Sequence, residues 1–382
     1  MHELFDFALR QGVEWRMSSL WPTGAGRLVS AAVTAAVLSC GTTEHVIGRD
    51  PDAAGAEVGT GGGTGKDSPK LAVQGPAFVL DGLPFDMWGI RVASATMSAA
   101  LTAHLIAQLD DYLAYGVNTI TVFYQGSNGG NHDPFTADGV AVDPEHAARM
   151  RSVVEAAAQR GMVVIVGIFY HIPDIGRVNI ESWTASVEAV RTVTREMLPY
   201  RNVIINVANQ NSSSEHDGLP WANVKSPEGA GEMFRAVHAI DPTRIVGTGS
   251  VGLGANVEIA KLPDADVLLF SGGGLEARMI EFRNAGLGDQ PIVCVELYGS
   301  KSDVYLPAGV FADNIKQQYI DDANAAAADP GLSVFFQATP WTQGIGSAGL
   351  HFDLAGAGTI GDPGIRWYFE HVASLTQRSS QN

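Results

Sequence analysis

Cysteine is scarce in this chain. Only Cys40 and Cys294 occur among 382 residues, so a disulfide framework is excluded and the Cys/His spacing of a zinc site cannot be assembled. Cys294 lies inside an apolar run and is most simply a small residue of the core.

Positive charge is scarce as well. The 24 lysines and arginines are outnumbered by 41 acidic residues, which gives a formal net charge of −17. This balance works against binding to phosphate backbones, so nucleic acid is not expected as a partner. The sequence contains no His-Glu-x-x-His pattern and no phosphate-binding glycine loop, so it predicts neither a metal nor a cofactor.

The front of the chain has the pattern of an export signal. An apolar run over 28–38 follows Arg27; it is too short for a bilayer span of roughly 20 residues but fits a signal-peptide core of about 7–15 residues. The acidic residues within 1–16 are wrong for the start of such a signal, so Met17 is a better candidate for the true initiator.

The run ends in VLSCG over 37–41, which resembles the lipobox of bacterial lipoproteins. The resemblance implies lipidation of Cys40, a membrane partner reached through that lipid anchor, and an exported protein of the cell envelope, periplasmic or on the cell surface. The alternative is an ordinary signal peptide cut nearby, with Cys40 incidental. Residues 41–75, with GTGGGTG at 59–65, are predicted to be a flexible tether.

The rest of the chain alternates short apolar runs with longer helix-like segments, as repeated β/α units do. The strands are expected at 87–92, 119–124, 163–170, 203–208, 245–249, 267–270, 292–296 and 334–337. Eight units predict an α/β protein with a closed (β/α)8 barrel over 76–376, since such a barrel typically needs about 250 residues. Residues 377–382 remain as a tail, and no Gly-x-Gly-x-x-Gly turn supports a dinucleotide-binding sheet instead.

Local signals agree with this division. Asp143-Pro144 and Ser226-Pro227 each place a capping side chain before a proline, which predicts helix starts. Before the first barrel strand, residues 78–85 predict a short hairpin with an Asp-Gly turn that closes the bottom of the barrel.

Catalytic groups of a (β/α)8 barrel lie at the carboxyl ends of its strands and in the loops that follow. The polar and aromatic residues there are Arg91, Tyr124, Gln125, Tyr170, His171, Asn209, Gln210, Ser271, Glu296, Tyr298, Gln337, Trp341 and Gln343. Rings stack on sugar faces and amides bond to hydroxyls, so this mixture suits a carbohydrate. Glu296 is notable because a charge at the end of an apolar strand is costly unless it is used or paired.

Three segments carry a resemblance to a family: VIINVAN at 203–209, PIVCVELYG at 291–299 and Pro340-Trp341. The folded part resembles clan A glycoside hydrolases, most of all the family 5 cellulase-like barrels. The resemblance implies that Glu296 is the nucleophile of a retaining mechanism, that Asn209 binds near the sugar 2-hydroxyl, and that Trp341 is a stacking platform. Arg91, Tyr124, Tyr170, His171 and Tyr298 are expected to bind the oligo- or polysaccharide substrate.

The chain departs from that family at one position. The acid/base glutamate is replaced by Gln210, and an amide neither protonates a leaving group nor deprotonates water. Three interpretations are open. A neighbouring side chain supplies the proton, for which the candidates are Glu215, His216 and Asp217; the substrate has a leaving group that needs no proton, as in the myrosinase-like thioglucosidases; or the protein is a carbohydrate-binding surface lipoprotein without catalysis.

Overall fold

The computed structural model describes residues 68–126, 133–170, 177–297, 307–338, 341–343 and 350–379. The leader, Cys40 and most of the expected tether lie outside these residues. Among the described helices, none has the length and apolar character to cross a membrane.

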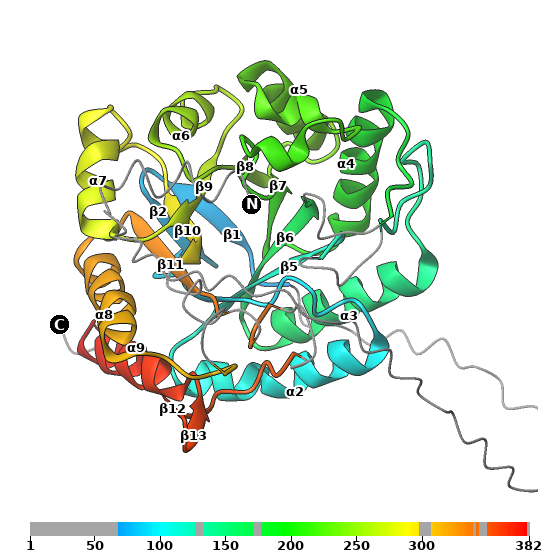
Figure 1. Ribbon diagram of the computed structural model, residues 1–382. Helices are drawn as coiled ribbons and strands as arrows, with labels where there is room; N and C mark the ends of the chain where they lie inside the picture. The colour runs from blue at the N-terminus through cyan, green and yellow to red at the C-terminus, as the bar shows by residue number, and fades with distance from the viewer. Residues whose placement is uncertain are drawn as a thin grey trace, which may run out of the picture. The chain divides into compact units, whose positions relative to one another are not determined.

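Eight parallel strands form a closed barrel, which confirms the predicted fold class (Figure 1). The strands are β4 (Trp88–Arg91), β5 (Thr119–Phe123), β6 (Val163–Phe169), β7 (Val203–Ala208), β8 (Ile245–Thr248), β9 (Val267–Gly272), β10 (Ile292–Leu297) and β11 (Leu332–Phe336). Neighbours along the chain are neighbours in the barrel, and β11 pairs with β4 to close it. Every strand therefore ends at the same rim.

The helices lie around this barrel (Figure 1). They are α2 (Ala99–Ala114), α3 (Pro144–Gln159), α4 (Trp183–Met197), α5 (Pro227–His238), α6 (Leu253–Ala260), α7 (Leu275–Asn284), α8 (Asp313–Ala328) and α9 (Arg366–Ser379). The predicted caps are present: Asp143 accepts a hydrogen bond from the His146 amide at 2.8 Å, and Ser226 accepts one from the Gly229 amide at 3.0 Å. Smaller elements are the turns η1 (Ser214–His216) and η2 (Ala222–Lys225) and the hairpin of β12 (Ala355–Thr359) and β13 (Asp362–Gly364).

The predicted hairpin belongs to a three-stranded antiparallel sheet of β1 (Leu71–Gln74), β2 (Ala77–Leu80) and β3 (Leu83–Phe85). Leu71 and Phe78 are buried in one cluster with inward-facing barrel residues such as Val163 and Ile204. The sheet therefore closes the bottom of the barrel, as expected. Two boundaries differ from the sequence-based division, since β1 falls inside the range assigned to the tether and α9 runs into the range assigned to the tail.

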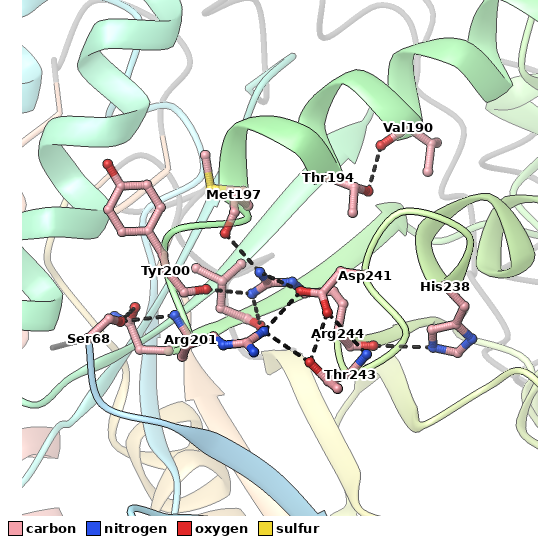
Figure 2. Close-up of polar contacts among 12 residues, drawn as sticks. Ser68, Val190, Thr194, Met197, Tyr200, Arg201, His238, Asp241, Thr243 and Arg244 are labelled. Atoms are coloured by element: carbon pink, nitrogen blue, oxygen red, sulfur yellow. Dashed lines mark hydrogen bonds and ion pairs between the residues drawn. The ribbon is translucent and has the colours of Figure 1, made fainter.

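A buried arginine ties the bottom of the barrel together (Figure 2). Arg244 is 3% exposed and donates to the carbonyl oxygens of Met197, Tyr200 and Val203 at 2.8, 2.7 and 3.2 Å. Asp241 pairs with the same guanidinium at 3.0 Å. The end of α4 and the starts of β7 and β8 are thereby held in register, because breaking one of these bonds would leave a further buried cationic donor without an acceptor.

His238 gives this region a pH-dependent contribution to stability. Its Nε2 donates to Asp266 at 3.0 Å and to the carbonyl of Arg244 at 3.2 Å, and the hydrogen bond to Asp266 raises the pKa of His238. A raised histidine pKa stabilises the fold fully below the ordinary value of about 6.5, and the contribution is lost as pH rises through the folded-state value. We therefore expect the stability difference between wild type and His238→Gln to shrink as pH rises from about 6 to 9. Urea unfolding across this range measures it; a difference independent of pH would contradict the assignment.

Candidate active site

Glu296 lies at the end of β10 and is 6% exposed. The ladder between β10 and β9 shifts register between Cys294 and Glu296, which is the mark of a β-bulge. A bulge changes the direction in which a strand's next side chain points. Val295 belongs to the core cluster inside the barrel. In a regular strand the next residue, Glu296, would face the helix layer. The bulge allows its side chain to turn toward the rim of the barrel instead.

The two oxygens of the Glu296 carboxylate have different surroundings. Oε2 lies 3.3 Å from Nε2 of Gln210, 3.4 Å from Oγ of Ser271 and 3.6 Å from Nη2 of Arg91. Oε1 receives no hydrogen bond from any residue in the described ranges. Among the described residues, the carboxylate is thus oriented through one oxygen.

Arg91 is completely buried at the end of β4 and connects the site. Its Nη2 donates to Asn209 Oδ1 at 3.0 Å and to the Tyr170 hydroxyl at 3.2 Å, and its Nε donates to Gln343 Oε1 at 2.5 Å. Gln343 also donates to the Tyr170 hydroxyl at 3.3 Å, which closes a ring of hydrogen bonds. A buried guanidinium with this set of partners has a single favourable orientation.

Below the guanidinium lies an aromatic ring, that of Phe123 at the end of β5. The Arg91 Cζ is 4.9 Å from the centre of this ring, within the range of a cation–π contact. Room for the ring exists because β6 has Gly167 beside it; a Cβ there would lie 2.1 Å from the Phe123 ring. The position of Arg91, and through it that of Glu296, therefore depends on a glycine in the next strand.

Asn209 and Gln210 follow directly after β7. Asn209 Oδ1 accepts from Arg91, whereas its Nδ2 is buried and has no hydrogen-bond partner among the described residues. Gln210 has φ +45°, a left-handed conformation that is uncommon outside glycine and costs on the order of 1–3 kcal/mol. Strain of this kind persists only where the surrounding contacts impose it.

Side-chain contacts bring together seven of the residues expected at the strand ends and in the loops that follow, namely Arg91, Tyr170, Asn209, Gln210, Ser271, Glu296 and Gln343. Tyr124 is not among them. Its hydroxyl donates to Glu196 on α4 at 2.8 Å and its ring stacks on His146, behind the strands. Burial and the nearby Glu196 carboxylate raise the pKa of Tyr124 well above its usual range. His171 and Tyr298 lie outside the described residues.

Trp341 is packed into the rim and is 4% exposed. One face of its ring stacks on His351 with centroids 4.0 Å apart, and its Nε1 donates to the carbonyl of Asp353 at 2.8 Å. Its role as a sugar platform stays a prediction.

The three candidate substitutes for the missing acid are in different environments. Glu215 and Asp217 are exposed, and Asp217 pairs with Lys225. His216 is completely buried, with both ring nitrogens in hydrogen bonds to Asn209 and Trp221. Proton donation by His216 would require at least one of these bonds to break.

Some residues that shape the site were not singled out from the sequence. Phe123 and Gly167 belong to apolar runs in which nothing distinguishes them from core residues. The bulge at Glu296 has no sequence signal either, although an acid at the end of an apolar strand already indicated an unusual position.

Comparisons with known proteins bear on the fold. A scan against models of protein families gives no match, and a search of curated proteins gives none either. Among solved structures, an endo-1,4-beta-mannanase from Rhizomucor miehei is similar with a TM-score of 0.57 and 15% identity, covering 82% of this chain and 100% of that chain.

Two further solved structures are similar to this chain over a comparable range. A putative glycoside hydrolase from Bacteroides vulgatus has a TM-score of 0.59 and 13% identity, covering 83% of this chain and 62% of that chain. A beta-glucanase from Saccharophagus degradans, solved in complex with cellotetraose, has a TM-score of 0.53 and 14% identity, covering 82% of this chain and 94% of that chain. The chain therefore has the barrel fold that these glycoside hydrolases share.

The stacking of Arg91 on Phe123 predicts the effect of a small change at Gly167. We expect Gly167→Ala to lower the free energy of unfolding by about 1–3 kcal/mol, because the added methyl overlaps the Phe123 ring. Gly254→Ala is the matched control: nothing lies within 4 Å of a Cβ there, and alanine is favoured over glycine in a helix by up to about 1 kcal/mol. Urea unfolding of both variants measures the difference, and equal stabilities would contradict the packing described.

Proposed function

We propose that this protein is a glycoside hydrolase-like enzyme that acts on carbohydrate by a retaining mechanism, with Glu296 as the nucleophile. The observation that carries the proposal is the buried Glu296 carboxylate at the end of β10, whose Oε2 contacts Arg91, Gln210 and Ser271, while the described residues make none of these contacts to Oε1. A nucleophile fixed through one oxygen presents the other in a defined direction, which is how positioning lowers a barrier. The resemblance of the segments around Asn209 and Glu296 to clan A glycoside hydrolases, and the shared barrel fold, support the same conclusion.

The chemical step follows from this geometry. Glu296 Oε1 attacks the anomeric carbon, the bond to the leaving group breaks, and the leaving group departs with the electron pair, so that an ester joins the sugar to Glu296. Water then attacks the same carbon, the bond to Glu296 breaks and restores the carboxylate, and the proton that the water loses passes to solvent or to the departed anion. The resemblance assigns Asn209 to the sugar 2-hydroxyl, and its Nδ2 is a donor without a partner among the described residues.

Gln210 restricts which substrates suit this site. Its amide donates to Glu296 but gives no proton to a leaving group, and loss of general acid/base help costs about 10²–10⁴-fold in rate. The proposal therefore favours glycosides whose leaving group is stable as an anion, such as an aryl oxide or a thiolate. An ordinary sugar leaving group would require Glu215, Asp217 or another acid to move into the site.

A second candidate function has a specific observation in its favour. If the amide of Gln210 serves only to bond to Glu296, the site binds carbohydrate without cleaving it, and the protein is a carbohydrate-binding surface lipoprotein. The two functions differ in turnover and share the ability to bind sugar.

Aryl glycosides with a good leaving group, tested with and without azide, separate these functions. Azide attacks the glycosyl ester without needing a base, so we expect it to accelerate the wild type, and we expect Gln210→Glu to raise turnover of poorly activated glycosides by about 10²-fold or more. Glu296→Ala should abolish turnover of the aryl glycosides both with and without azide. Sugar-dependent stabilisation with no turnover in any form would instead support the binding protein.

We also propose that Cys40 carries a lipid anchor at the cell envelope, which the VLSCG segment supports. Cys40→Ala is expected to move the protein from the membrane fraction to the soluble fraction of the producing bacterium, and Cys294→Ala, a change in the core, is the control that should not. Release of neither variant, or equal release of both, would contradict the anchor.

A further inference from the structure

The side chain of His216 is buried in the loop that follows β7, six residues beyond Gln210 in the chain. Its Nδ1 lies 3.1 Å from Trp221 Nε1, and its Nε2 lies 2.8 Å from the carbonyl oxygen of Asn209. An indole N–H only donates, so Nδ1 must accept. A carbonyl only accepts, so Nε2 must carry the proton. The partners thus select one neutral tautomer.

The carbonyl held by His216 belongs to the peptide bond between Asn209 and Gln210. The two sides of this peptide are also fixed, since the Asn209 amide donates to Phe169 at 2.9 Å and the Asn211 amide donates to Gly249 at 3.1 Å. Gln210 adopts its left-handed conformation at this point. Rotation of the peptide out of the strained state would remove the acceptor from a buried histidine, which costs about 1–3 kcal/mol.

Trp221 is itself immobilised. It is completely buried, and its indole stacks on Phe169 with centroids 4.9 Å apart and an angle of 12° between the rings. Phe169 is the last residue of β6. Through Trp221 and His216, the end of one barrel strand therefore determines the geometry of the peptide at the end of the next.

We propose that His216 and Trp221 form a clamp whose purpose is to position Gln210 and Asn209 against Glu296 and Arg91. His216 is then a positioning residue that keeps its proton on Nε2, and not the missing acid. The inference rests on the proposed function for its catalytic meaning. With the peptide in this orientation, Gln210 Nε2 lies 3.3 Å from Glu296 Oε2 and Asn209 Oδ1 lies 3.0 Å from Arg91 Nη2.

Two variants test the clamp. His216→Phe keeps a ring and removes both nitrogens, and Trp221→Phe keeps the stack on Phe169 and removes the N–H that selects the tautomer. Trp183→Phe is the matched control, since Trp183 donates to Glu232 at 2.9 Å at the surface. With an aryl glycoside we expect kcat to fall about 10–100-fold in both clamp variants, a cost typical of a misplaced group, with KM changed far less. The control should keep the wild-type kcat.

A merely structural role for His216 predicts something different. Loss of stability alone would lower the melting temperature and leave kcat of the folded enzyme unchanged well below that temperature. That result would overturn the proposal.

Two measurements stand apart from turnover, so failure of the proposed function would not decide the clamp. Nitrogen-15 NMR of the wild type should show Nε2 protonated and Nδ1 bare; a proton on Nδ1 would overturn the proposal. A crystal structure of a clamp variant should show Gln210 out of its left-handed conformation and its amide beyond hydrogen-bond distance of Glu296. Retention of both features in the variant would overturn the proposal as well. If His216→Phe does not fold, Trp221→Phe and the NMR of the wild type still test the clamp.

Discussion

The buried charge of Arg91 is the constraint on which the rest of the site depends. A guanidinium with no exposure, inside an apolar barrel, must have every partner supplied by the protein. Those partners come from the ends of several strands, with Tyr170 removed by 79 positions in the sequence and Gln343 by 252. Satisfying one cation therefore aligns elements that the chain assembles from distant regions.

The same constraint explains why the site is ready before any ligand arrives. The hydrogen-bond ring of Arg91, Tyr170 and Gln343 orients the guanidinium, and Arg91, Gln210 and Ser271 together contact Oε2 of Glu296. Groups that need no reorganisation when charge develops are effective both in binding and in catalysis. The two proposed functions differ in whether a proton reaches the leaving group, and the contacts described around Glu296 suit either of them.

The barrel could be predicted because its signals are local and repeated. Apolar runs at 203–208 and 292–296 match β7 and most of β10, and the caps at Asp143 and Ser226 begin the helices that they predicted. The arrangement of the site could be predicted only in part. The position of Glu296 at a strand end was legible, whereas the bulge that turns it, and the packing of Phe123 over Gly167, depend on contacts across strands that no local pattern records.

Tyr124 shows the limit of reasoning from strand ends. Its place after an apolar run suggested a ligand-binding side chain, yet its hydroxyl is used by Glu196 on α4. A shift of one residue at the end of a strand turns a side chain from the rim to the helix layer. The alternation of side chains does not predict which direction a residue takes where the regular strand ends.

The sheet of β1, β2 and β3 also determines at which end of the barrel the described chain begins. Ser68, where the described chain begins, bonds to Asn202 and Arg201 just before β7, at the amino ends of the barrel strands. Glu296 lies at the carboxyl ends, on the opposite side. The described chain therefore enters at the end of the barrel opposite the rim that carries Glu296, so a change in the residues where it enters is separated from Glu296 by the length of the barrel strands.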